Sequence, residues 1–123
     1  MCRSVERHLK PGGRFVTMNN NPFQRVETFT LTQKHGLVKS VAGELREGTP
    51  ILITCLLPSG RSVSFEDYHL SPATHEQALQ AAGLRKIEWH RPQVSPEGEK
   101  EFGREYWADF LDAEPFIGLE CWK

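Results

Sequence analysis

Two short segments of the sequence carry the side chains best suited to hold or activate a polar small molecule. The first is Asn19-Asn20-Asn21, which Pro22 follows. An asparagine side chain both donates and accepts hydrogen bonds, so three in a row suit a polar substrate that is bound without charge. The alternative is that these residues, which tolerate turn conformations, only end the strand before them. The sequence leaves both interpretations open.

The second segment is Tyr68-His69, which stands just before a predicted helix start. Histidine is the usual base near neutral pH, and a base in a site removes a proton from a reacting nitrogen or oxygen. The alternative is that Tyr68 packs at the edge of a sheet and His69 is solvated. The remaining histidines adjoin no candidate nucleophile, and we expect them at the surface: His8, His35, His75 and His90.

The three cysteines, Cys2, Cys55 and Cys121, are odd in number and far apart in the sequence. They form no Cys-x-x-Cys pair and no Cys/His spacing of the kind that binds zinc. We therefore expect reduced thiols in a cytoplasmic protein and no metal site. Cys55 and Cys121 lie within apolar segments, where thiols act as small hydrophobic side chains.

Charge and length narrow the class of protein further. The chain has 123 residues, which predicts a single domain over 1–123. Its 15 basic and 16 acidic residues nearly cancel, so it lacks the concentrated basic field that nucleic acid or an anionic membrane requires. No apolar run approaches the roughly 20 residues that span a bilayer. We expect neither nucleic acid nor a membrane as a partner.

The first third of the chain predicts a helix followed by a strand. Val5 and Leu9 are four residues apart and share one helical face, and Pro11 with Gly12 ends the helix. The segment 14–18 is nearly continuous in apolar character, which predicts a strand covered on both faces. The three asparagines then stand at its carboxyl end, where open α/β sheets place their ligands.

The middle of the chain predicts an antiparallel meander of three strands over 37–46, 50–57 and 61–66. The linkers "REGT" and "PSG" have turn composition and are too short for a parallel crossover. In the third strand, Val63 and Phe65 alternate with polar residues, which predicts that both point inward.

The last third predicts two helices and two strands. Ser71-Pro72 opens a helix that Gly83 ends, and a strand over 85–90 follows. A second Ser-Pro pair opens a helix over 95–112, and the chain ends in a strand over 116–122. Five aromatic side chains at helical spacing or nearby are expected in the core: Phe102, Tyr106, Trp107, Phe110 and Trp122.

This order of elements, with "LKPGGRFV" leading into the first strand and "SPATHEQALQAAGLRKIEW" opening the last third, resembles the C-terminal half of class I S-adenosylmethionine-dependent methyltransferases. The small-molecule enzymes of methyltransferase types 11 and 12 are the most similar. The resemblance covers essentially the whole chain. It implies an α/β fold, the C-terminal part of a Rossmann-like methyltransferase domain, with a mixed sheet and an inserted antiparallel meander. It also implies that the strand 116–122 lies between 14–18 and 85–90, antiparallel to both.

The resemblance implies methyl transfer from S-adenosylmethionine to a small acceptor. Tyr68 and His69 would be catalytic, and Asn19, Asn20 and Asn21 would bind the substrate. The family's cofactor-binding glycine-rich turn and acidic residue belong to strands that precede this segment, so no cofactor-binding residue is assigned. We expect the chain to be inactive alone and to form a homo-oligomer that covers the edge of strand 14–18. The alternative is a non-catalytic binding or assembly module that pairs with another chain.

Overall fold

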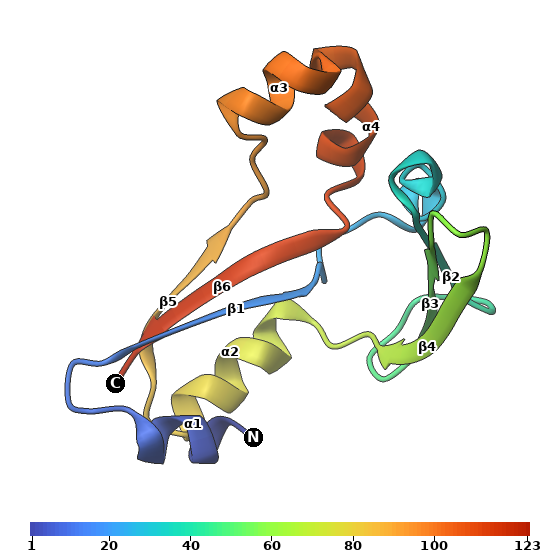
Figure 1. Ribbon diagram of the computed structural model, residues 1–123. Coiled ribbons are helices and arrows are strands. Elements are labelled where there is room, and N and C mark those ends of the chain that lie inside the picture. The colour runs from blue at the N-terminus through green and yellow to red at the C-terminus, as the bar shows by residue number, and fades with distance from the viewer.

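The computed structural model describes residues 1–123, which form two three-stranded sheets and four α-helices (Figure 1). The elements follow in the order α1 (Cys2–His8), β1 (Arg14–Asn20), the 3₁₀ turns η1 (Val26–Thr28) and η2 (Gln33–His35), β2 (Leu37–Ser40), β3 (Pro50–Leu56), β4 (Ser62–Tyr68), α2 (Pro72–Ala81), β5 (Arg85–His90), α3 (Pro96–Phe102), α4 (Arg104–Ala113) and β6 (Phe116–Trp122). None of the helices is both long and apolar enough to cross a membrane.

The first sheet has the strand order β1-β6-β5, and β6 is antiparallel to both neighbours. This confirms the predicted position of the last strand. β1 and β5 therefore run parallel to each other on either side of β6. β1 extends two residues beyond the predicted 14–18, because Asn19 and Asn20 pair with Ile117 and Phe116. Its other edge has no partner strand within the chain.

One face of this sheet is covered by α1 and α2, which lie side by side beneath it in Figure 1. Leu79 of α2 packs with Leu84, Leu119 and Cys121 in a buried cluster. The opposite face is open. Val16 is 57% exposed and Met18 is 74% exposed, so the prediction that strand 14–18 is covered on both faces is wrong for this chain. No element of the chain packs over those two side chains, and α1 and α2 share the other face.

The helix α2 begins and ends as its sequence predicts. The side chain of Ser71 accepts a hydrogen bond from the backbone N–H of Thr74, and Pro72 occupies the first turn. Gly83 follows the helix with φ at +92°, a conformation that glycine adopts without steric cost.

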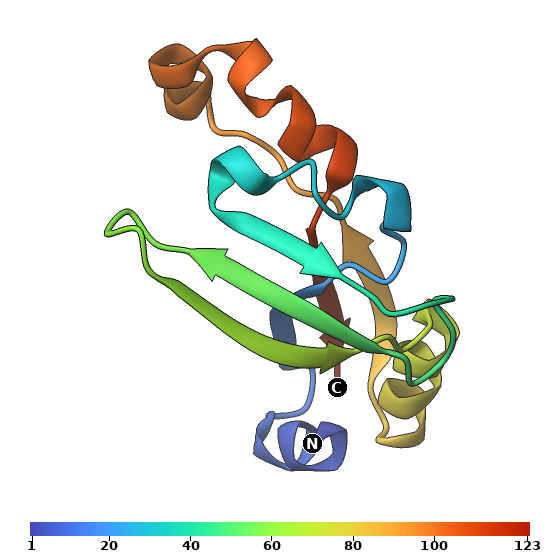
Figure 2. The ribbon, with the colours of Figure 1, turned by 90° about the vertical axis from the view of Figure 1, so that its right-hand side faces the viewer.

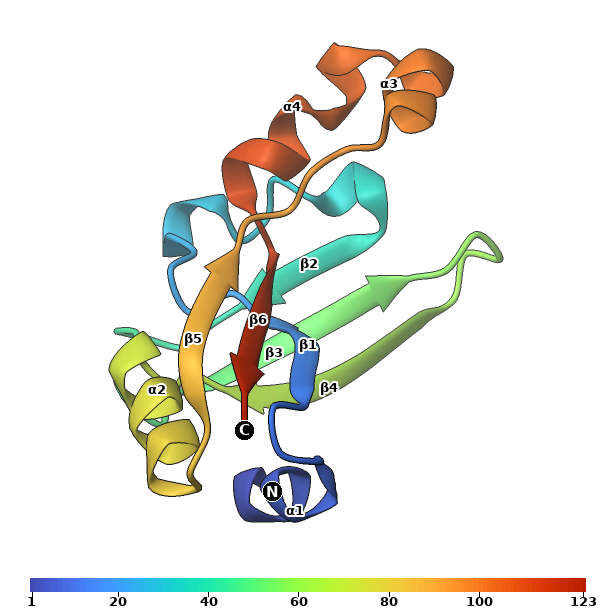
Figure 3. The ribbon, with the colours of Figure 1, turned by 90° about the vertical axis from the view of Figure 1, so that its left-hand side faces the viewer.

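The second sheet is the predicted meander, with the order β2-β3-β4 and antiparallel pairing throughout. Its strands cross those of the first sheet obliquely, in front of them in Figure 2 and behind them in Figure 3. β2 ends at Ser40, shorter than the predicted 37–46, because residues 41–49 form bends and a turn with Gly43 and Gly48 at positive φ. Its core comprises Phe29, Leu37, Ile51 and Ile53.

Val63 and Phe65 of β4 share the face of the core residue Ile53, yet both are about half exposed. The predicted inward direction is therefore correct, although neither side chain is buried. β4 is the edge strand of the meander, and the core of this sheet lies over β2 and β3. Phe65 instead lines a cleft, described below.

The predicted helix 95–112 is two helices, because Gly103 has φ at +83° and ends α3. The aromatic side chains there do not join the main core, and Phe102 is half exposed. Three of them surround His35 of η2, whose ring stacks on Trp107 and meets Tyr106 and Phe110 edge-on. The prediction of a core position is therefore wrong for the aromatic residues of α3 and α4, and the prediction of a surface position for His35 is also wrong, because this contact joins segments far apart in the sequence. Trp122 lies in β6 and is partly buried.

Candidate functional site

A cleft of about 490 Å³ lies along the free edge of β1, next to the end of β4 and the start of α2. It brings together four of the five candidate residues, Asn19, Asn20, Tyr68 and His69. Its walls are mainly apolar, with Phe15, Met18, Phe65, Leu70, Leu79 and Leu119 among the lining side chains. A mostly apolar cavity with a few convergent polar groups is the usual form of a small-molecule site.

Tyr68 and His69 are held at the cleft by the backbone of the meander. His69 donates its backbone N–H to the carbonyl of Thr49 at 2.9 Å and accepts from the N–H of Gly48 at 2.7 Å. The ring nitrogens of His69 make no hydrogen bond to the protein, so they are available to a ligand. Tyr68 is half exposed.

A carboxylate stands next to this histidine. Glu47 accepts hydrogen bonds from the backbone N–H of Ser71, the nearer at 3.0 Å. The pKa of Glu47 is lowered by a hydrogen bond from the side chain of Thr74, by the bond from Ser71 and by the nearby charge of His69. Glu47 thus connects the turn before β3 to the start of α2, and it keeps a negative charge close to the candidate base.

Asn20 is fixed by a buried lysine that sequence reasoning missed. Lys39 of β2 is only 1% exposed, and its Nζ donates to Oδ1 of Asn20, to Oε1 of Gln24 at 2.7 Å and to the carbonyl of Pro115 at 2.6 Å. All three acceptors are neutral. Burial lowers the pKa of Lys39 to about 8, and the charge of Asp67 partly opposes that effect.

The sequence does contain a signal for this lysine. Side chains two apart on a strand share a face, and Leu37, two residues before Lys39, is an inward-facing apolar residue. A strict reading of the alternation would have placed Lys39 inside. A lone lysine at such a position needs oxygen partners, because a buried cation without hydrogen bonds is very unfavourable.

Asn19 lines the cleft beside Asn20, and its Oδ1 accepts from the hydroxyl of Thr17 at 3.4 Å. Asn21 lies apart from them. Asn21 is 5% exposed, donates to the carbonyl of Glu114 at 2.7 Å and accepts from the N–H of Phe23 at 2.9 Å. Its side chain therefore holds the loop after β1 against the start of β6.

Asn21 instead borders a second cavity of about 520 Å³ at the carboxyl end of β5, together with Phe23, Trp89 and Arg91. Its charged side chains are already paired, since Arg91 bonds Glu114 and Arg25 lies 3.9 Å from Asp112. Glu114 raises the pKa of Arg91 through this bond and its charge. The cavity thus presents fewer free polar groups than the cleft.

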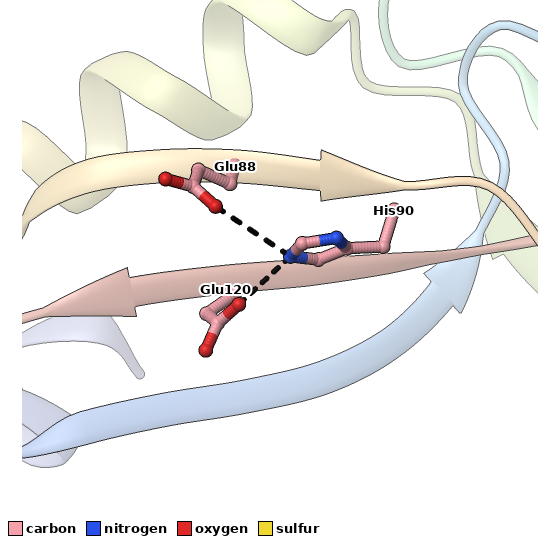
Figure 4. Close-up of side chains that lie close together, drawn as sticks. All are labelled: Glu88, His90 and Glu120. Carbon is pink, nitrogen blue, oxygen red and sulfur yellow. Dashed lines mark hydrogen bonds and ion pairs between the residues drawn. The ribbon is translucent and has the colours of Figure 1, made fainter.

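One group of side chains could hold a divalent metal, and Figure 4 shows it on the open face of the first sheet. The Nε2 of His90 lies 2.8 Å from a carboxylate oxygen of Glu120 and 3.9 Å from one of Glu88. The sequence did not indicate this group, because β6 brings Glu120 beside β5 from 30 residues away. Arg14 also bonds Glu120 at 2.9 Å, so a cationic side chain already pairs with one carboxylate of this group.

Asn19 and Asn20 therefore share one cleft with Tyr68 and His69. Lys39 bonds Asn20 from the meander. Cys121 is buried, and burial raises the pKa of its thiol, which fits the expected role as a small core residue. Cys2 lies at the cleft and Cys55 is partly buried in β3.

No protein-family model matches the chain, and no curated protein matches it. Solved structures do. An S-adenosylmethionine-dependent methyltransferase from Mesorhizobium loti is 18% identical with a TM-score of 0.55, and the match covers 99% of this chain and 53% of that one. A putative S-adenosylmethionine-dependent methyltransferase from Listeria monocytogenes is 20% identical with a TM-score of 0.58 and the same coverage.

The chain therefore spans about half the length of these two structures. The similarity extends over nearly all of this chain, including both sheets and the helices between them. At these identities the comparison establishes the fold. The chain has the α/β fold of about half of a Rossmann-like S-adenosylmethionine-dependent methyltransferase.

Proposed function

We propose that this chain forms the acceptor side of an S-adenosylmethionine-dependent methyltransferase that acts on a small molecule. The observation that carries the proposal is the cleft that joins Asn19, Asn20, Tyr68 and His69 at the carboxyl end of β1. The fold shared with two methyltransferases supports the reaction class. The chain's balanced charge and its apolar cleft favour a small acceptor over a nucleic acid or a membrane.

Each residue has a distinct role in this proposal. His69 is the base that removes a proton from the acceptor, since its ring nitrogens are free. Tyr68 borders the reacting group, and Asn19 with Asn20 orients the acceptor. Holding the acceptor in line with the methyl group supplies much of the acceleration in such a transfer. Asn21 acts indirectly, by holding the loop after β1.

The cofactor would be held mainly by residues outside this chain. Neither glycine pair resembles a cofactor turn, because Gly12 and Gly13 follow a helix, and Gly43 and Gly48 belong to the connection between β2 and β3. A glycine-rich cofactor turn instead joins a strand to the helix after it. We infer that the chain alone is inactive and binds S-adenosylmethionine weakly, and that it works in the cytoplasm with a cofactor-binding part.

The second candidate function is a non-catalytic module that pairs with another chain, and the free edge of β1 favours it. Val16 and Met18 expose apolar surface beside unpaired backbone groups, which is a template for association. We propose that this edge joins a second copy of the chain when no other strand covers it.

Methyl transfer in trans tests the first function. This chain would be mixed with the part of the Listeria monocytogenes methyltransferase that it does not match, and radiolabelled S-adenosylmethionine would be supplied with a panel of small acids, phenols and amines. We expect labelled product only when both parts are present, and much less product with His69→Ala. A complex that forms and binds cofactor, yet methylates no acceptor of the panel, would contradict the proposal and favour the module.

A further inference from the structure

The chemistry of Lys39 determines how the side chain of Asn20 is oriented. A lysine ammonium has three N–H donors and no acceptor, so every close polar neighbour of its Nζ must be an oxygen. The amide of Asn20 therefore turns its Oδ1 toward Lys39. The same argument orients Gln24, whose Nε2 then donates to the hydroxyl of Thr28 at 3.3 Å. Both amide orientations follow from one buried cation.

The remaining polar group of Asn20 is its Nδ2, which can only donate. This NH₂ group makes no hydrogen bond within the protein, although Asn20 lines the cleft and its Oδ1 is occupied. The N–H donors of this side chain are therefore free to pair with a ligand in the cleft, while its Oδ1 already accepts from Lys39. A ligand with an oxygen acceptor satisfies it, whereas a ligand with only donors leaves it unpaired.

The charge around Asn20 favours a negative ligand group. The ammonium of Lys39 is buried, and its three contacts are neutral, so no carboxylate neutralises it directly. Two acidic groups lie near the cleft, and backbone N–H groups hold both. Asp67, on the cleft wall, accepts from the backbone N–H of Tyr68 at 2.9 Å, and Glu47, next to His69, accepts from the backbone N–H of Ser71 at 3.0 Å. His69 and His75 also line the cleft. A buried charge acts strongly on neighbouring groups, because little solvent screens it.

From this geometry we propose that the cleft binds a small carboxylic acid, whose carboxylate accepts a hydrogen bond from Nδ2 of Asn20 beside the Lys39 ammonium. The rest of the ligand would pack on Phe65 and Met18, which line the cleft and are exposed. The assignment of this acid as the methyl acceptor rests on the proposed function, but the binding preference does not. Lys39 is then a specificity-determining residue that acts through Asn20.

Binding of three ring compounds of the same size tests this preference: benzoate, benzamide and benzylamine. In the isotope-labelled chain, we expect benzoate to shift the side-chain NH₂ resonances of Asn20 and to bind more tightly than benzamide. Benzylamine should leave those resonances unchanged. Stronger binding of benzylamine, or benzoate binding that leaves the Asn20 side-chain resonances unmoved, would overturn the proposal.

The matching variant is Asn20→Asp, which keeps the size of the side chain and its bond to Lys39 but replaces the NH₂ donor with an oxygen. Benzoate affinity should fall by about tenfold or more, as expected when a hydrogen bond to a charged group is lost and a repulsive oxygen replaces it. Ala78→Asp adds the same charge to the cleft wall from α2 and is the control for charge alone. We expect a loss of less than about threefold there.

An Asn20→Asp variant that binds benzoate as tightly as the original chain would overturn the proposal, as would equal losses in the two variants. Native-like backbone spectra of both variants ensure that the comparison concerns folded protein. If benzoate binds as expected and no methyl transfer is found in trans, the proposed function fails and the binding site stands. If transfer occurs only to amines, the proposed function stands and the assignment of the acid as the methyl acceptor fails.

Discussion

Replacing Lys39 with methionine removes a buried charge while keeping most of the side-chain volume, and its effect should depend on pH. The pKa of Lys39 is lowered from 10.5 to about 8 in the folded protein. Between these values the unfolded chain binds the proton more tightly than the folded chain. The stability of the original protein should therefore rise with pH across this window, because the unfavourable buried ammonium is being neutralised.

The size of this effect follows from the two pKa values. Each pKa unit corresponds to about 1.4 kcal/mol, so the interval between 10.5 and about 8 corresponds to roughly 3 kcal/mol. Below pH 8 the folded protein still carries the buried ammonium, and none of this stability is gained. Above pH 10.5 the ammonium is neutralised, and the gain in stability is complete. Lys39→Met has no ammonium at this position, so its stability should not show this rise, whatever its absolute value at neutral pH.

Urea denaturation followed by tryptophan fluorescence, at several values from pH 7 to pH 10.5, measures the difference between the two proteins. Taking the difference cancels the contributions of the titratable groups that the two proteins share. Lys100→Met is the matched control, because Lys100 is exposed and has no ion-pair partner. If the difference in unfolding free energy between the original protein and Lys39→Met stays constant within about 0.5 kcal/mol over this pH range, the buried ammonium does not destabilise the fold as described.

Four further predictions follow from the site, the edge of β1 and His35. Calorimetric titration of the chain alone should detect no binding of S-adenosylmethionine or S-adenosylhomocysteine at low micromolar concentrations, and a low-micromolar dissociation constant would contradict this. In an enzyme that combines this chain with a cofactor-binding part, Asn20→Ala and His69→Ala should lower turnover and leave cofactor affinity nearly unchanged, and full activity in both would assign them structural roles only. Light scattering at micromolar concentration should show a homodimer that Met18→Lys weakens, whereas a monomer with strong amide protection along β1 would disprove association through this edge. The pKa of His35 is lowered by burial and then by the charge of Lys34, so His35 should contribute stability above pH 6.5 that is lost as the pH falls through its folded pKa. His35→Phe should lack this loss in acid denaturation, and an acid profile identical to that of the original protein would contradict the prediction.

Local sequence signals account well for parts of the fold. The ends of α2 lie where Ser71-Pro72 and Gly83 predict them, because capping and backbone preferences act within a few residues. The position of β6 between β1 and β5 came from the family resemblance, since nothing local indicates which strands pair across a hundred residues. The grouping of Asn19 and Asn20 with Tyr68 and His69 likewise depends on how the meander folds against β1.

The features that sequence reasoning missed depend on contacts between distant segments. Lys39 is buried because Asn20, Gln24 and Pro115 supply three oxygens, and these come from three separate parts of the chain. His35 is enclosed by aromatic residues of α4. The spacing of these residues predicts one buried face of a single helix, but Gly103 divides that segment into two helices. Periodicity identifies a face, but it does not identify what covers that face.

In the function proposed above, the cleft along β1 is the ligand site of this chain. The most direct test is a backbone amide map of the isotope-labelled protein, recorded with a panel of small acids, phenols and amines. We expect the shifted amides to lie at Asn19, Asn20 and His69 and on the turn of α2 that faces them. Shifts that gather instead around Asn21 and Arg91, at the second cavity, or along α3 and α4 would contradict it.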